Sequence, residues 1–258
     1  MPLSLIHIYL KDAERTSQSF SMVFEESVLR SIDELDNMLF YLRRNIEARK
    51  GTTDYNEILH STDIPGDIVV QVSIIDAQGI MRASTAGPQP APPVDLSDRE
   101  HFRAQLESNE DRLFISKPLI GRVSGKWSVQ LSRRFLNADG TFGGVIVVSL
   151  DPEHFTKFYR KVDLASSGSI SLIGDDGVIR SAGGQSGNVR MGQDIRGTEA
   201  FDRMQSGVNS VLEEPDTSTG QLRLVALRKV RGCLLYTSLP EIVSRHADGH
   251  GDHKDDHR

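Results

Sequence analysis

The stretch LFISKPLIGRVSGKWSVQLSRRFLNADGTFGGVIVVSL, Leu113–Leu150, decides the fold of this chain. Its β-branched and aromatic runs predict strands at Leu113–Pro118, Lys126–Phe135 and Phe142–Leu150. The residues between these runs, Gly121–Gly125 and Asn137–Gly140, are of the types that favour tight turns. The stretch therefore predicts an antiparallel sheet built from hairpins.

A helix is expected just before this sheet, at Asp98–Leu106, and it would cover one face. The segment that leads into it, Asp95–Phe102, carries an arginine, Arg99. A curved sheet with a helix and a loop across one face forms a cup. We interpret the cup as the place where a small ligand is held.

Composition excludes several classes of protein. The 258 residues are 38% hydrophobic and 26% charged, which is typical of a folded chain that is neither disordered nor embedded in a membrane. The formal net charge is -6 and there is no basic block, so no nucleic-acid partner is expected. A single cysteine, Cys233, excludes an internal disulfide and a paired-cysteine metal site.

A long helix is predicted from about Glu14 to Lys50, where proline and glycine are absent. Apolar residues recur along it every three or four positions and define what we call the helix seam: Val28, Ile32, Leu35, Leu39, Leu42 and Ile46. The seam fits two interpretations equally well. The helix can pack on its own domain, or it can be a stalk that also pairs with a second copy of the chain.

Further elements are expected between the long helix and the central sheet, and just after it. Asp54 would cap a short helix, Asp54–Asp63, and Asp151 would cap a helix at Pro152–Val162. Strands are expected at Ile68–Asp76 and Ile80–Ser84.

The order of motifs then repeats. Val72–Arg82 resembles Ile170–Arg180 at an offset of 98 residues, 72 to 170, and Glu100–Phe102 resembles Glu199–Phe201 at an offset of 99, 100 to 199. A third pair lies at an offset of 95, 125 to 220: Gly125–Arg133 and Gly220–Arg228. Similar offsets in the same order indicate two copies of one unit. The second copy is expected to be truncated, because little after Arg228 can supply its last strand.

The two ends differ in style from the rest. Residues 1–13 and 233–258 resemble translated non-coding or cloning-adapter sequence, and are treated as a doubtful leader and a doubtful, disordered tail. Cys233–Pro240 is not expected to continue a sheet, and the histidines after it are not expected to form a metal site. The remaining divisions are a stalk helix at 14–50, a first domain at 51–162 and a second domain at 163–232. The predicted fold class is α+β, with a long N-terminal helix followed by two tandem domains with antiparallel sheets.

The ordered set of motifs resembles the double-Cache (tandem PAS-like, PDC) sensor domains, of the type found ahead of bacterial diguanylate cyclases. The segments that carry the resemblance are the long helix, Asp95–Phe102, Ile115–Pro118, Gly121–Trp127, Leu131–Arg134, Asp139–Val145, Ser149–Asp151 and Ser171–Gly177. The family implies an extracytoplasmic fragment of a membrane receptor, whose membrane helices and output domain lie outside this chain. It also implies that both domains are PAS-like, with 51–162 the membrane-distal, ligand-binding domain and 163–232 the membrane-proximal one. It implies a ligand-binding role and no catalysis by the fragment.

The resemblance also implies which residues meet the ligand. In amino-acid-sensing relatives an Arg-x-Trp-Tyr motif opens the pocket, and Arg99, His101 and Phe102 match its arginine and aromatic positions. Where those relatives place a tyrosine and two aspartates for the ligand's ammonium, this chain has Leu119, Gly121 and Ser149. The carboxylate half of the signature is therefore kept and the ammonium half is lost. The expected ligand is a small carboxylate, or another ligand without an amine.

Other residues are assigned with open alternatives. Lys117, Arg122 and Lys126 would support an anion, or would be solvated loop and sheet-edge charges, and Arg133 is assigned to the same solvated class. Trp127 would be core or pocket wall, His101 a contact or a packing residue, and Arg99 a ligand contact or a surface residue paired with an acid.

The function also has alternatives. The chain would be a ligand-free interaction module that dimerises through the N-terminal helix, or the sensor of a histidine kinase or chemoreceptor. A homodimer through that helix is expected in either case. No cofactor is expected, since the sequence contains no GxSxG, HExxH, P-loop or GxGxxG motif.

Overall fold

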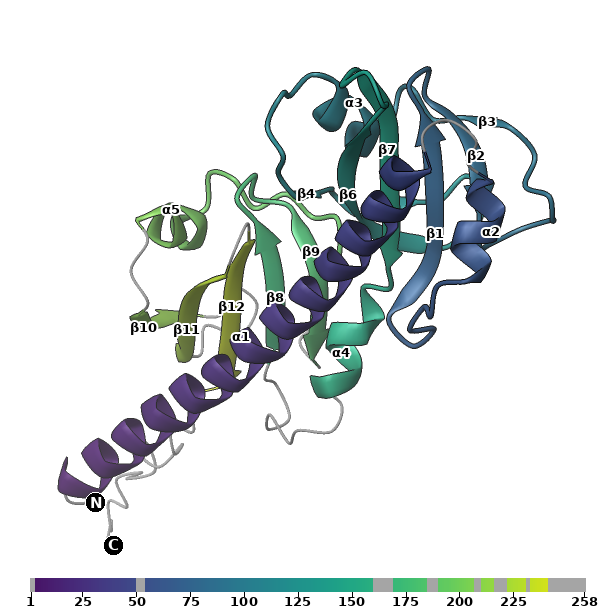
Figure 1. The fold of residues 1–258 in the computed structure, drawn as a ribbon. Coiled ribbons are helices and arrows are strands. Elements are labelled where there is room, and N and C mark those ends of the chain that lie inside the picture. Colours follow the sequence, from purple (N-terminus) through teal and green to yellow (C-terminus); the bar gives the residue numbers. More distant parts are fainter. Residues whose placement is uncertain are drawn as a thin grey trace, which may run out of the picture.

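The computed structural model describes residues 3–49, 54–159, 169–184, 190–206, 210–215, 222–230 and 233–240. A long helix, α1 (Leu3–Ala48), runs along two antiparallel sheets that lie one after the other on the same side of it (Figure 1). The helix begins at Leu3 rather than near Glu14, so it includes residues that the sequence had marked as a doubtful leader. Among the described residues no helix combines the length and apolar character that crossing a membrane requires.

The first sheet has seven strands in the order β3-β2-β1-β7-β6-β4, with β5 paired to β6. The strands are β1 (Val69–Asp76), β2 (Ile80–Ser84), β3 (Val94–Asp95), β4 (Phe114–Ile115), β5 (Leu119–Ile120), β6 (Trp127–Leu136) and β7 (Phe142–Leu150). Three short helices accompany it: α2 (Tyr55–His60), α3 (Glu100–Leu106) and α4 (Glu153–Tyr159). Asp54 caps α2 as expected, since its side chain accepts from the backbone N–H groups of Asn56 and Glu57.

The second sheet repeats the first. Its order is β10-β11-β12-β8-β9, which matches β4-β6-β7-β1-β2 position by position. Its strands are β8 (Ser169–Gly174), β9 (Ile179–Gly184), β10 (Ser210–Pro215), β11 (Leu222–Val230) and β12 (Cys233–Pro240), and its helix is α5 (Glu199–Gln205). The starts of α3 and α5 differ by the 99 residues of the sequence repeat, 100 to 199. The α+β, tandem PAS-like fold is therefore confirmed.

The expectation that the second sheet lacks its last strand is wrong. Cys233–Pro240 forms β12, which pairs with β11 on one side and with β8 on the other. It occupies the central position that β7 holds in the first sheet. The histidine-rich end that follows, 241–258, lies outside the described residues, as does the end of the helix expected at Pro152–Val162.

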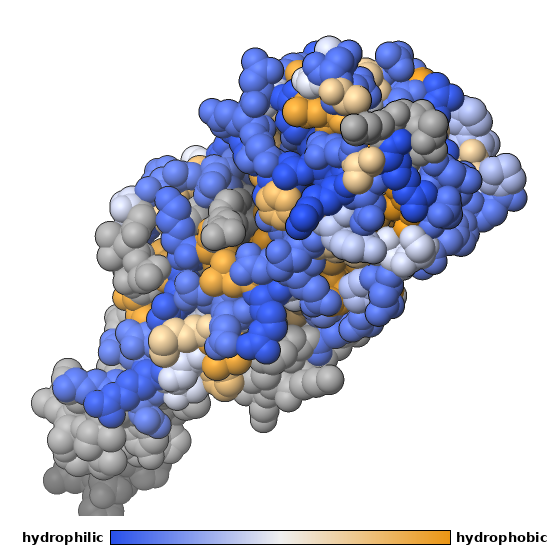
Figure 2. Space-filling model, in the orientation of Figure 1, coloured by the Kyte–Doolittle hydropathy of each residue, from blue (hydrophilic) through white to orange (hydrophobic). Residues whose placement is uncertain are grey.

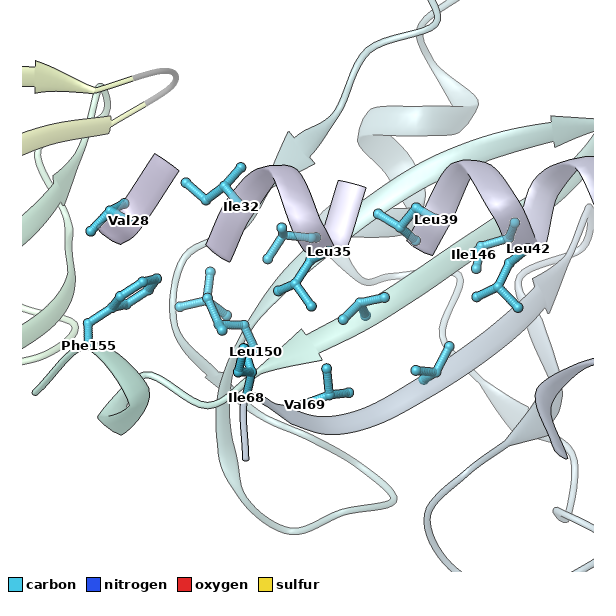
Figure 3. Close-up of a cluster of buried hydrophobic side chains, with 14 of the residues drawn as sticks. Val28, Ile32, Leu35, Leu39, Leu42, Ile68, Val69, Ile146, Leu150 and Phe155 are labelled. Carbon is cyan, nitrogen blue, oxygen red and sulfur yellow. The ribbon is translucent and has the colours of Figure 1, made fainter. Parts of the chain in front are cut away.

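The helix seam packs on the chain's own sheets. All six seam residues are buried, and they join one apolar cluster with the inner face of the first sheet, represented by Val72, Ile146 and Leu150, and with Ile170 of the second. Figure 3 shows seam side chains directed toward the strands, with Phe155 of α4 close to Val28 and Ile32. The first interpretation of the seam is thereby confirmed, and the seam itself is not available to a second copy.

A polar contact also ties the second sheet to the helix. Arg228 of β11 donates from Nε to Ser21 Oγ at 2.9 Å and from Nη1 to Glu25 Oε2 at 3.1 Å. Both sheets thus use α1 as a common support.

On the face seen in Figure 2, hydrophilic residues predominate over α1, and hydrophobic areas are small and separate.

Candidate functional site

Strand alternation divides the first sheet into two faces. Val72, Val148 and Leu131 join the apolar cluster around α1, so the residues that alternate with them lie on the opposite face. Here α3 covers the sheet, because Ser132 Oγ donates to the carbonyl of His101 at 3.0 Å and Gln105 Nε2 donates to the carbonyl of Ser132 at 2.8 Å. We call this covered surface the cup face.

One part of the cup face is apolar and filled. Phe102 of α3 is buried in a cluster that comprises Ile75, Met81, Leu96, Val145 and Val147. Its ring lies 6.1 Å from that of Phe142 in an edge-on arrangement. Phe102 therefore anchors α3 to the sheet, a packing role that leaves ligand contact to its neighbours.

The other part of the cup face is polar and uncharged. Gln71 of β1 and Gln130 of β6 both lie opposite Ser149 of β7, which makes a row across neighbouring strands that we call the polar row. These side chains are between 3% and 6% exposed. Ser149 Oγ donates to Gln130 Oε1 at 2.6 Å, and Gln130 Nε2 donates to Ser128 Oγ at 2.8 Å. Gln71 Nε2 donates to Ser84 Oγ at 2.9 Å.

Arg99 lies at the start of α3 and is half-buried. The one hydrogen bond that its side chain makes within the described chain is long, 3.5 Å from Nη2 to the carbonyl of Ile120. Burial, and then the positive charge of Arg122, lowers the pKa of Arg99, although a guanidinium stays charged at neutral pH. The fork of donors is thus largely unused and can receive a carboxylate with two parallel bonds.

His101 lies two residues further on and is 4% exposed. Burial lowers the pKa of His101 to about 4, with a further contribution from the charge of Arg99, so the imidazole is neutral at pH 7. Its Nδ1 has no hydrogen-bond partner among the described residues. A buried polar atom without a partner is uncommon, and a bound molecule is one way to satisfy it.

Arg122, by contrast, already has its partners. It donates to both carboxylate oxygens of Asp98, at 2.7 and 2.6 Å, and to the carbonyl of Asp95 at 2.6 Å. The hydrogen bond to Asp98 raises the pKa of Arg122, and the same bond lowers the pKa of Asp98. Arg122 therefore fastens the β5–β6 turn to the segment before α3.

Two further candidates lie away from this group. Lys117 Nζ is 3.9 Å from Asp176 Oδ2 of the second sheet's first hairpin, so it faces the other domain. Trp127 is 49% exposed, and is neither core nor enclosed pocket wall. Position 127 alternates with Ser128 and Gln130, so strand geometry directs it away from the cup face. The structure thus places Arg99, His101 and Phe102 together at the start of α3, puts Ser149 on the sheet face that α3 covers, and leaves Lys117 and Trp127 apart.

Gln71 and Gln130 were not singled out by the sequence interpretation. The signal was present, because polar residues alternate with valine, isoleucine and leucine at 71 and 73 in β1 and at 128, 130 and 132 in β6. Alternation of this kind is normally assigned to a solvent-facing side. Here the same residues are buried, since α3 and its flanking loops cover that face.

A small cavity of about 10 Å³ lies between the domains. Ile115, Val129 and Phe155 line it from the first domain and Leu172 and Arg180 from the second. It has room for about one water molecule. It is therefore a packing gap at the junction and not a ligand site of the expected size.

Comparison with known proteins shows which kinds of protein share this fold. No protein-family model matches the sequence, and the search of curated proteins found no significant match. Among solved structures, the extracellular domain of rpHK1S-Z16, described as a histidine kinase, is 25% identical. The match covers 91% of this chain and 97% of that domain, with a TM-score of 0.80.

Chemoreceptor domains share the fold at lower identity. The ligand-binding domain of Campylobacter jejuni Tlp3, in complex with L-valine, is 12% identical over 93% of this chain and 97% of that one, with a TM-score of 0.65. The corresponding domain of the Pseudomonas aeruginosa PAO1 amino-acid chemoreceptor PctC, in complex with GABA, is 17% identical over 88% and 98%, with a TM-score of 0.64. With its repeated sheet and shared helix, the chain is an extracytoplasmic sensor domain with the tandem PAS-like fold.

Proposed function

We propose that the chain senses a small carboxylate without an amine, which binds in the cup of the first domain with its carboxylate on Arg99. The observation that carries the proposal is the largely unused guanidinium of Arg99 beside His101, whose Nδ1 has no partner among the residues that the structure describes. Both belong to the segment that opens α3, on a sheet face whose buried polar side chains are neutral.

Charge decides against an amine. A buried ammonium needs a carboxylate, because an unpaired buried charge costs several kcal/mol, on the order of 3–5 when a partner is removed. Asp98 is committed to Arg122, and the polar row offers amide and hydroxyl oxygens only. The guanidinium of Arg99 would also repel a cation bound beside it.

The output of the receptor is the second part of the proposal. The similar structures belong to a histidine kinase and to chemoreceptors, and they favour these outputs over the diguanylate cyclase expected from the sequence. Occupation of the cup would reach the output through α1, which supports both sheets. A ligand can shift the equilibrium between two arrangements of the helix only if it binds one of them more tightly than the other.

The test is calorimetry on the full chain with a panel of short carboxylates, and with L-valine, L-isoleucine and GABA for comparison. Arg99→Ala should weaken carboxylate binding by about tenfold or more, since a charge-assisted hydrogen bond contributes roughly 1.5–3 kcal/mol. The matched control is Arg103→Ala, one turn later on α3, where Arg103 is exposed and pairs with Glu107 at 3.2 Å. It should leave the affinity unchanged.

Two results would overturn the proposal. Carboxylate binding that is equal in the wild type and in Arg99→Ala would remove Arg99 from the site. Tighter binding of an amino acid than of its amine-free analogue would reject the ligand class.

A ligand-free dimerisation module is the second candidate. It is favoured by the mutual hydrogen bonds of Gln130, Ser149 and Ser128, which fill part of the cup face from within. Such a dimer would need a face of α1 other than the seam. Sedimentation analysis of the chain with and without carboxylate separates the two functions, because a module of this kind would dimerise without regard to the ligand.

A further inference from the structure

We propose that the polar row of Gln71, Ser149 and Gln130 is a hydroxyl-binding subsite, so that the ligand is a hydroxylated carboxylate. This inference rests on the proposed function, since it takes the carboxylate at Arg99 as given and asks what the rest of the ligand must be. It specifies the chemistry of the part of the ligand that lies at the polar row, away from the carboxylate.

The register of the strands builds the row. Gln71 and Gln130 face Ser149 from either side, and directly opposite residues hold their Cβ atoms about 4.5–5.5 Å apart. The two amides therefore flank one hydroxyl within the span of a small molecule. Alternate residues of β1 and β6, Ser73 and Ser132, extend the polar surface by another step.

The row keeps unused capacity for hydrogen bonds. A glutamine amide has two N–H donors and two acceptor sites on its oxygen. Gln130 uses one N–H on Ser128 and one acceptor site on Ser149, which leaves a donor and an acceptor. A ligand hydroxyl both donates and accepts, so it can satisfy the two together.

Neither kind of charged group suits the row. Among the described residues the members of the row, Gln71, Ser149 and Gln130, are uncharged, so within the row itself an ammonium would meet no carboxylate and a second carboxylate would meet no cation. Arg134 lies on the same face of β6, but it donates to the carbonyl of Ser108 and stacks 5.3 Å above the ring of Phe142. A plain alkyl end would cover the remaining N–H donor and acceptor site of Gln130 without satisfying them, which a site built on hydrogen bonds disfavours.

The experiment uses a matched series of four-carbon acids with the full chain and ligand-observed NMR titration. Butanoate is the reference, 2-, 3- and 4-hydroxybutanoate add one hydroxyl at different positions, and 4-aminobutanoate replaces the hydroxyl by an ammonium. At least one hydroxybutanoate should bind about tenfold tighter than butanoate. The isomer that gains most reports how far the row lies from Arg99.

A double variant, Gln130→Met with Ser149→Ala, removes both partners of the hydrogen bond between these residues, a change that is often nearly neutral for folding, and it also removes the donor to Ser128. It should abolish the advantage of the hydroxyl, read as the ratio of hydroxybutanoate to butanoate affinity in the same protein. The comparison of ligands on the unaltered chain tests the proposal even where the variant does not fold.

The outcomes separate the two proposals. If butanoate and all its hydroxy analogues bind equally, and Arg99→Ala weakens them all, the hydroxyl subsite is rejected and the carboxylate site stands. If 4-aminobutanoate binds tightest, both are rejected. If the hydroxyl advantage survives the double variant, the row is not the subsite.

Discussion

Arg133 of β6 and Asp36 of α1 form a buried ion pair between residues 97 positions apart in the sequence. Arg133 Nη2 donates to Asp36 Oδ2 at 2.9 Å, and its Nε donates to the other oxygen. The guanidinium also lies 4.0 Å from the centre of the Phe40 ring and donates to Asp111 at 2.8 Å. This cluster fixes α1 against the sheet that holds the cup.

Removing one partner of this pair should be costly. Asp36→Ala leaves the buried guanidinium of Arg133 with one acidic partner, the exposed Asp111. We therefore expect a loss of about 3–5 kcal/mol in the free energy of unfolding. The control is Glu26→Ala, which breaks the exposed pair with Arg30 and should cost less than about 1 kcal/mol. Urea unfolding measures both, and equal midpoints for the two variants would contradict the assignment.

The seam of α1 gives the second prediction. Leu39 is fully buried against the chain's own sheets, so Leu39→Ala should cost about 2–5 kcal/mol at any protein concentration. A seam that instead joined two copies would give a loss that depends on concentration, because dimer stability follows mass action. Thermal unfolding over a wide range of concentrations distinguishes these results.

Local patterns in the sequence predicted local structure well. The Asp54 cap gave α2, glycine-bounded runs gave β2 and β7 with the observed bounds, and the repeat placed β8, β9 and α5 in the second domain. Each of these signals depends on neighbours within a few residues, or on a copy of the same motif. None requires knowledge of what packs against what.

The misses concern partners distant in sequence. Arg133 had been assigned to a solvated sheet edge, because nothing near it in the sequence points to Asp36. Trp127 is the first residue of β6. Strand alternation predicts which face of the sheet a side chain lies on, but it does not predict whether other elements cover the end of the strand. Lys117 was grouped with Arg99 by sequence proximity, but the turn of the chain directs it to Asp176.

The miss at Cys233–Pro240 leads to the third prediction. This segment has no turn residues or alternation that mark a strand, and its place follows from the gap between β8 and β11 that it fills. A chain ending at Gly232 would leave both neighbours with unpaired backbone groups. We expect it to lose hydrogen-exchange protection throughout β8 and β11.

A chain ending at Pro240 is the matched control, and it should keep the protection of the full chain. Exchange measured by mass spectrometry over the two strands compares the three lengths directly. Equal protection with and without Cys233–Pro240 would show that β12 contributes nothing to the folded sheet, and would restore the expectation of a sheet that ends before Cys233.

His101 gives the fourth prediction, through pH. Its pKa is lowered to about 4 by burial and by Arg99, whereas an unfolded histidine titrates near 6.5. Between these values the unfolded chain binds more protons, so stability is fully present above about pH 6.5 and is lost as the pH falls toward 4. From pH 7 to pH 5 this group alone should lower the free energy of unfolding by about 2 kcal/mol.

The variant His101→Gln isolates this contribution, because glutamine keeps hydrogen-bonding capacity but does not titrate in this range. Urea unfolding at both pH values should show a smaller loss for the variant than for the wild type, and the difference is assigned to His101. Other groups with shifted pKa, such as His154 and Asp111, contribute equally to both proteins. Parallel losses in the two proteins would mean that His101 is accessible to water and protons, and the buried, neutral imidazole on which the ligand site depends would have to be abandoned.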